Sequence, residues 1–125
     1  MSSHTSISQD KLSRLIGTVK TPVLIDVRTD EDFAADPRLI PGAVRRSHRD
    51  AADWSSDFAG RPAIVVCMRG EKLAQGTAAW LRHADVAAET LEGGFEGWKE
   101  AKLPLVNAAK LPPRDAQGQI GRAHV

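Results

Sequence analysis

The chain has 125 residues, of which 42% are hydrophobic and 5% aromatic, and its 17 basic and 16 acidic side chains leave a formal net charge of +1. This length predicts one domain with a modest core, and a net charge so close to zero gives no general affinity for polyanions. The single cysteine excludes an intramolecular disulfide and any Cys-x-x-Cys redox or zinc motif, which predicts a reducing compartment.

The sequence shows neither a secretory signal nor an apolar run that approaches the roughly 18 residues that a membrane-spanning helix needs. We therefore expect a cytoplasmic protein that binds neither membranes nor nucleic acid. One local cluster of basic residues stands out against the balanced composition, and we interpret it as a solvated face. It consists of Arg45, Arg46, His48 and Arg49.

The first half of the chain alternates between helix and strand signals. Ser8 is a suitable N-cap for a helix over residues 9–16, which Gly17 ends. The aliphatic run at 23–27 predicts a strand that is buried on both faces. The further elements expected here are a helix that starts after Thr29 and ends at Asp36-Pro37, a turn at 40–42, a helix over 51–58 closed by Gly60, and a strand over 63–66.

The second half continues the same alternation. Apolar positions at Leu73, Thr77, Trp80 and Leu81 predict a helix whose apolar face packs on the sheet. Strands that alternate with helices predict an α/β domain with a central, mainly parallel β-sheet flanked by helices on both faces. The other elements expected here are a strand over 86–91, a loop at Gly93-Gly94 and a helix over 95–101.

We assign residues 1–106 to this domain and 107–125 to a flexible C-terminal tail or linker. The tail has paired prolines, two glycines, two glutamines and little apolar content, so it buries too little surface to order itself.

Cys67 directly follows an apolar strand and begins a polar loop that leads into the next helix. Ligands collect beyond the carboxyl ends of strands in parallel sheets, and the unpaired N–H groups of a helix start favour a thiolate over a thiol. Arg69 and Lys72 add two cations, Gly70 allows the amides to curl around an anion, and Glu71 opposes them. The alternative is that the cysteine packs in the core as a small hydrophobic side chain. The charged residues that follow it disfavour a core position.

Four separated segments together resemble the single-domain rhodaneses, a sulfurtransferase family. Their order and spacing match that family over about residues 7–106, and the resemblance rests on all four being in register. The segments are LIDVR at 24–28, IPGA at 40–43, the loop at 67–72 and LEGGFEGW at 91–98.

The resemblance implies a rhodanese-like domain in which Cys67 takes a sulfane sulfur from thiosulfate or a persulfide donor and becomes a persulfide. The sulfur then passes to cyanide or a thiol. No cofactor and no metal are implied. The expected partners are the small-molecule sulfur donor and the thiol or cyanide acceptor, with a protein as a further candidate acceptor.

The resemblance also suggests a role for each site residue. Cys67 is the nucleophile, and the amides of residues 68–72 hold the persulfide anion in the manner of an oxyanion hole. The substrate-binding residues are Arg69 for the anionic donor, Lys72 as a second cation, and Met68, Gly70 and Glu71 in the rest of the loop. Asp26, Arg28 and Trp98 give structural support, and Phe95 packs beside Trp98.

The sequence departs from the family at several positions. Met68 stands where many members have arginine, Lys72 stands where arginine commonly closes the loop, and Leu73 replaces a small hydroxylic residue. Leu39 stands where a histidine often precedes the IPGA segment. Because lysine lacks the bidentate fork of arginine, the choice of sulfur donor stays open.

Three alternatives accompany the sulfurtransferase hypothesis. A cysteine-dependent phosphatase is disfavoured, because its longer loop would place the required arginine where this chain has Leu73. A docking or regulatory module of the same fold is the main alternative, since a fold alone does not license an activity. The segment at 111–115 resembles the joint between a rhodanese domain and a chromate-resistance-type domain, which would make this chain the N-terminal part of a longer protein. The enzymatic hypothesis requires that the Cys67 side chain not be enclosed in the apolar interior away from any cavity.

Overall fold

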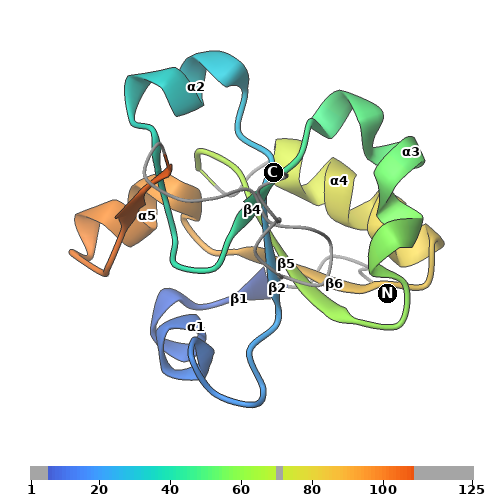
Figure 1. The fold of residues 1–125 in the computed structure, drawn as a ribbon, viewed down its shortest axis with the longest axis horizontal. Helices are drawn as coiled ribbons and strands as arrows, with labels where there is room; N and C mark the ends of the chain where they lie inside the picture. The colour runs from blue at the N-terminus through green and yellow to red at the C-terminus, as the bar shows by residue number, and fades with distance from the viewer. Residues whose placement is uncertain (1–5, 70–71, 109–125) are drawn as a thin grey trace, which may run out of the picture.

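The computed structural model describes residues 6–69 and 72–108, and a parallel β-sheet lies at the centre of this part (Figure 1). All neighbouring strands of the sheet that the structure describes run parallel, in the order β1-β6-β5-β2-β4. The expected strands at 23–27, 63–66 and 86–91 are therefore confirmed. The strands of the sheet are β1 (Ser6–Ile7), β2 (Val23–Asp26), β4 (Val44–Arg45), β5 (Pro62–Val66) and β6 (Ala87–Leu91).

Helices cover both faces of the sheet, as the sequence predicts (Figure 1). Because successive residues of a strand point to opposite faces, β5 sends Ile64 and Val66 into one core and Ala63 and Val65 into the other. The first core is closed by α1 (Gln9–Leu15) and α5 (Gly94–Glu100), and the second by α3 (Ala51–Trp54), η2 (Ser55–Phe58) and α4 (Lys72–His83).

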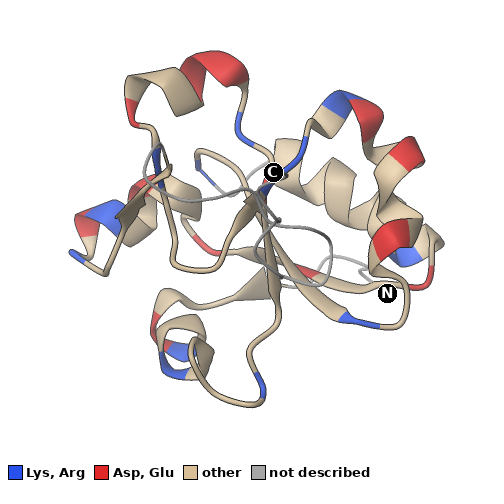
Figure 2. Ribbon diagram, in the orientation of Figure 1, with Lys and Arg blue, Asp and Glu red and all other residues tan. Residues whose placement is uncertain are grey.

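The remaining elements connect the strands at the sheet edges. Helix α2 (Asp30–Ala35) is capped by Thr29, and acidic residues fill its first turn, where the helix dipole favours them (Figure 2). The helix expected over 51–58 is divided into α3 and the 3₁₀ turn η2, and it is preceded by a second 3₁₀ turn, η1 (His48–Asp50). Strands β3 (Arg38–Leu39) and β7 (Val106–Asn107) form a separate antiparallel pair.

Strand β7 extends to Asn107, which pairs with Arg38, so ordered pairing reaches one residue beyond the boundary that we expected at 106. The backbone N–H of Ala108 donates a hydrogen bond to the Pro37 carbonyl. The rest of the expected tail, 109–125, lies outside the described residues. Among the helices that the structure describes, none is both long enough and apolar enough to cross a membrane.

The prediction for Trp80 is wrong. Its indole is 51% exposed, whereas the face of α4 that packs on the sheet is formed by Ala74, Thr77, Ala78 and Leu81. The buried stripe is therefore made mostly of small residues, which lets α4 lie close to β5 and β6. The helical period was read correctly, but the bulky indole lies outside the stripe that it defines.

Two glycines of the LEGGFEGW segment are required by close packing of α1 on α5. Gly93 has φ +75°, and a Cβ atom there would lie 2.7 Å from Gln9 Nε2 and 3.3 Å from Gly97 Cα. A Cβ atom at Gly97 would also overlap Gln9 Nε2. The Gln9 side chain can therefore reach across and donate a hydrogen bond to the Glu92 carbonyl, at 3.1 Å.

We predict that Gly93→Ala destabilises the fold by about 2 kcal/mol, because a left-handed residue with a Cβ costs about 1–2 kcal/mol and the Gln9 contact is lost as well. Gly60→Ala is the matched control, since Gly60 has φ +79° but a Cβ atom there would meet nothing within 4 Å. Urea unfolding should therefore show a larger loss for Gly93→Ala than for Gly60→Ala. Equal losses would mean that the α1–α5 packing contributes nothing.

Candidate functional site

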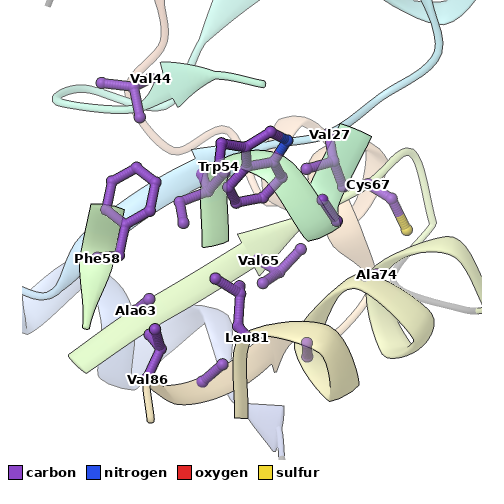
Figure 3. Close-up of a cluster of buried hydrophobic side chains, with 14 residues drawn as sticks. Val27, Val44, Trp54, Phe58, Ala63, Val65, Cys67, Ala74, Leu81 and Val86 are labelled. Carbon is purple, nitrogen blue, oxygen red and sulfur yellow. The ribbon is translucent and has the colours of Figure 1, made fainter. Parts of the chain in front are cut away.

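Cys67 is the first residue after β5, and its side chain is 4% exposed. It belongs to the core cluster on the α4 side of the sheet, together with Val27, Trp54 and Ala74. Figure 3 shows the side chain at the margin of this cluster, with the sulfur pointing out of the group of labelled side chains. The thiol is thus more buried than a nucleophile at the mouth of a loop would be, and burial alone also fits a cysteine that packs as a small hydrophobic side chain.

The backbone around Cys67 is fixed by the start of α5. The N–H of Phe95 donates to the Cys67 carbonyl at 2.8 Å, and the N–H of Glu96 donates to the Met68 carbonyl at 2.9 Å. A helix start leaves its first N–H groups without intrahelical partners, and no side chain caps α5. The two carbonyls of the loop therefore act as the cap, and they tie the carboxyl end of β5 to α5.

A buried ion pair lies at the end of the neighbouring strand β2. Asp26 and Arg28 are each 1% exposed, and Arg28 Nε lies 2.9 Å from Asp26 Oδ2. The Arg28 backbone N–H also donates to Asp26 Oδ1 at 2.9 Å. Burial raises the pKa of the Asp26 carboxyl and lowers the pKa of the Arg28 guanidinium, because each charged form loses its hydration, while the attraction between the two opposes both shifts.

The guanidinium of Arg28 also joins two other segments of the chain, at 36–38 and at Phe95. It donates to the Asp36 carbonyl at 3.0 Å and to the Arg38 carbonyl at 2.6 Å. Its Cζ atom lies 3.7 Å from the centroid of the Phe95 ring, which is a close cation–π contact. Since Phe95 is the residue whose N–H holds the Cys67 carbonyl, the ion pair supports the cysteine loop through this ring.

Trp98 lies deeper, on the same side of the sheet as Phe95. It is 1% exposed, and its indole N–H donates to the Pro104 carbonyl at 2.8 Å. Trp98 therefore anchors α5 to the segment that follows it, and no contact of Trp98 with the Cys67 side chain is among the observed interactions.

The structure turns Arg69 toward α5. Its side chain is 73% exposed, and Nε lies 3.8 Å from Glu96 Oε2. Together with Gln9, Gly93, Glu96, Gly97 and Glu100, Arg69 lines a cavity of about 380 Å³ on the α1–α5 side of the sheet. Met68 packs against the core of that same side, whereas Cys67 belongs to the other core. In this conformation the donor-binding role predicted for Arg69 would require its side chain to leave Glu96.

The other predicted loop residues are described only in part. Lys72 is exposed and begins α4, so it stands at a helix start as expected. Gly70 and Glu71 lie outside the described residues, and so does the anion-binding curl that we expected from Gly70. Within the described ranges, no group of three or more His, Cys, Asp or Glu side chains could hold a metal ion.

Sequence reasoning missed the part that Arg45 plays beneath the site. We expected a solvated basic face there, and this is wrong for Arg45: its Nη2 donates to the Arg28 carbonyl at 2.9 Å, and its Cζ lies 4.1 Å from the Phe33 ring centroid. Arg49 is exposed, as that interpretation predicts. A run of basic residues does not predict such packing, because the aromatic partner, Phe33, is distant in the sequence.

The match to a family model identifies the fold and its family. The model for the rhodanese-like domain matches residues 8–101, which is more than half of the chain, and the chain therefore belongs to the rhodanese-like domain family. The predicted resemblance and fold class are confirmed.

Several solved structures are similar to this chain. A rhodanese-like domain protein from Staphylococcus aureus has 27% sequence identity and a TM-score of 0.66, over 75% of this chain and 90% of that chain. A thiosulfate sulfurtransferase from Pseudomonas aeruginosa is similar in fold, with a TM-score of 0.71 over 95% of this chain and 22% of that chain, at 20% identity.

Curated relatives are much longer than this chain. A tRNA 2-selenouridine synthase from Shewanella sp. (strain ANA-3) is 31% identical over 72 residues, which cover 57% of this chain and 19% of the relative. The synthase from Shewanella piezotolerans is 26% identical over 111 residues, which cover 86% of this chain and 28% of the relative. The matched part of this chain thus spans 19% to 28% of the length of these relatives.

We predict that Arg28→Met destabilises the fold by about 3–5 kcal/mol, because it leaves the Asp26 carboxylate buried without its partner. In the double variant Asp26→Asn/Arg28→Met no charge is left behind, so part of this loss should be recovered. Urea unfolding of both variants provides the measurement. A single variant within about 1 kcal/mol of the wild type would contradict the account, since such a small loss is typical of exposed ion pairs.

A second prediction concerns Asp36. Hydrogen bonding from Arg38, strengthened by the nearby charges of Arg38 and Lys99, lowers the pKa of the Asp36 carboxyl from 3.8 to about 2. The ionised carboxylate therefore stabilises the fold above pH 3.8, and this contribution is lost as the pH falls through about 2. Asp36→Asn should have a lower free energy of unfolding than the wild type at pH 6. The difference between the two should disappear as the pH falls to about 2. A difference that does not change with pH would disprove the assignment.

Proposed function

We propose that this domain is a sulfurtransferase that carries a sulfane sulfur as a persulfide on Cys67. Its place in the rhodanese-like family supports this, as does the position of the cysteine at the carboxyl end of a central strand of a parallel sheet, where ligands collect in α/β folds. The observation that carries the proposal is the cysteine loop itself, whose carbonyls are held by the N–H groups of Phe95 and Glu96. These two bonds fix the path of the chain beyond β5 and so hold Cys67 at the carboxyl edge of the sheet.

The reaction proceeds in two displacement steps. The Cys67 thiolate attacks the outer sulfur of thiosulfate, the bond between the two donor sulfurs breaks, and its electron pair leaves with sulfite. Cys67 then carries a persulfide anion, and the total charge is unchanged. In the second step an acceptor thiolate or cyanide attacks the terminal sulfur, which returns the Cys67 thiolate and releases the acceptor persulfide or thiocyanate.

The anionic donor and product need positive charge near the sulfur. Arg69 and Lys72 supply it in the proposed reaction, with Arg69 exchanging Glu96 for the donor. This exchange costs little free energy, because an ion pair that is 3.8 Å long and partly exposed contributes little. The Asp26–Arg28 pair and Trp98 act as positioning residues, since they support α5 and do not touch the sulfur in the observed interactions.

The proposed setting is the cytoplasm, where a reducing environment keeps a lone thiol available. The curated relatives are named tRNA 2-selenouridine synthases. Since each is several times longer than this chain, we propose only the sulfur-carrying step for the domain described here.

We predict that incubation with thiosulfate adds one sulfur atom to the intact chain, as measured by mass spectrometry. Peptide mapping should place the added sulfur on Cys67, and cyanide should remove it with release of thiocyanate. Cys67→Ser should gain no sulfur. If thiosulfate, an alkyl persulfide and a mercapto acid donor all leave Cys67 unmodified in the folded chain, the docking module becomes the better interpretation.

We further predict that Arg69→Met raises the KM for thiosulfate by about five- to tenfold, which corresponds to the roughly 1 kcal/mol expected of an exposed charge contact. Arg14→Met is the matched control, because Arg14 is equally exposed and is paired with Asp10 on α1, away from the loop. The control removes the same charge and should leave the KM unchanged. Equal effects of the two variants would show that Arg69 acts only through the net charge.

A further inference from the structure

The exposed Trp80 stands between two hollows on the outer side of α4. Its indole is 51% exposed, and within the described residues its one aromatic neighbour is His83, in an edge-to-face contact with 6.3 Å between ring centroids. The hollows have volumes of about 220 and 320 Å³. The first is lined by His48, Lys72, Leu73, Gly76, Thr77 and Trp80, and the second by Gly76, Ala79, Trp80 and His83. We call the two hollows together the α4 groove.

Neither the backbone conformation nor the packing of the fold requires glycine at position 76. It lies in the middle of α4, its φ angle is not positive, and a Cβ atom there would meet nothing within 4 Å. Glycine destabilises the middle of a helix relative to alanine. Because Gly76 has no side chain, the helix backbone is uncovered one turn away from Trp80. The α4 groove is therefore open to a molecule outside the fold.

The charges of the α4 groove suit an anion. Lys72 carries an ammonium group at one end, and His48 and His83 add imidazoles whose N–H groups can donate hydrogen bonds. Among the described residues that line the two hollows, none has a carboxylate. A flat indole beside bare backbone also suits the planar amide or carboxylate groups of an organic molecule.

The α4 groove adjoins the core cluster that contains Cys67. Leu73 lines the first hollow and also packs against the core cluster that contains Cys67, and the next residue, Ala74, belongs to that cluster. Figure 3 shows Cys67 and the first turns of α4 side by side at the margin of the cluster. Leu73 is therefore the side chain that connects the first hollow to the cluster that contains Cys67.

We propose that the α4 groove binds a carboxylate-bearing organic thiol, the acceptor that takes the sulfur from Cys67. This inference rests on the function proposed above and adds the substrate class of its second step. The thiol enters as the thiolate. Its carboxylates lie toward Lys72 and His48, and the rest of the thiol molecule covers Gly76 and stacks on Trp80. The small volumes favour a short peptide or mercapto acid over a protein segment. Thiosulfate and cyanide are too small to use Trp80.

The test compares glutathione, which has two carboxylates, with uncharged 2-mercaptoethanol as acceptors at saturating thiosulfate. The decisive variant is Gly76→Leu, because leucine is a good helix former and fills the α4 groove without weakening the helix. Gln75→Leu is the matched control, since Gln75 is the exposed neighbour of Gly76 on α4 and lines neither hollow. Gly76→Leu should lower the ratio of kcat/KM for glutathione to that for 2-mercaptoethanol by about tenfold. The control should leave this ratio unchanged.

Binding is measured separately from catalysis with S-methylglutathione, which cannot accept sulfur. It should change the Trp80 fluorescence of the wild type at millimolar concentration, and the change should be absent in Trp80→Phe and Gly76→Leu. Urea unfolding should show that Gly76→Leu is at least as stable as the wild type, which excludes misfolding as the cause.

The outcomes separate the two proposals. Fluorescence changes in a protein that transfers no sulfur would support the α4 groove as a thiol site while overturning the proposed function. Sulfur transfer with an unchanged acceptor ratio in Gly76→Leu and no response to S-methylglutathione would overturn the α4 groove alone. A dimer in solution that Gly76→Leu dissociates would also overturn it, since a second copy would then cover this face.

Discussion

Two hydrogen bonds from the start of α5 to the cysteine loop are the constraint on which the site depends. The N–H groups of Phe95 and Glu96 would otherwise lack partners, as the first N–H groups of any helix do, and the carbonyls of Cys67 and Met68 satisfy them. The same two bonds fix the direction in which the chain leaves β5. The helix and the loop therefore stabilise each other, and neither can shift without exposing unpaired backbone groups.

The buried pair of Asp26 and Arg28 extends this constraint to the next strand. Arg28 is held by the Asp26 carboxylate and by two carbonyls, and its Cζ atom lies 3.7 Å from the centroid of the Phe95 ring. Burying a charged pair costs hydration, and this pair lies where three separated segments of the chain meet, at 26–28, 36–38 and Phe95. The family motifs are far apart in the sequence, but in the fold they come together at the carboxyl edge of the sheet. Cys67 lies at this edge, where β5 ends.

The sequence was sufficient for the parts of the fold whose signal is local. The aliphatic runs of β2 and β5, the Ser8 and Thr29 caps and the helical period of α4 each depend on neighbouring residues, and all are confirmed. Strands of two residues, such as β4 and β7, are too short to show a period, so they escaped notice. The division of residues 51–58 into α3 and η2 also has no signal that we recognise.

The candidate site could be predicted as a set of residues but not as an arrangement. Cys67 stands at the expected end of a strand, yet its burial depends on α3 and α4, which come from both sides of it in the sequence. Arg69 pairs with Glu96 and Arg45 packs on Phe33, and neither contact follows from spacing along the chain. Trp80 was assigned to the buried face because it lies at helical spacing from Leu73 and Thr77, but that face is formed by the smaller residues of α4 and Leu81 instead.

Amide hydrogen exchange of the native protein tests the central claim most directly. If the carbonyls of Cys67 and Met68 cap α5, the amides of Phe95 and Glu96 should exchange as slowly as those inside β5. Glu31, at the position in α2 that corresponds to Phe95 in α5, provides the comparison and should exchange rapidly, because no partner for its N–H is among the observed bonds. Rapid exchange at Phe95 and Glu96, at the rate of Glu31, would show that α5 does not hold the cysteine loop and would contradict the account of the site.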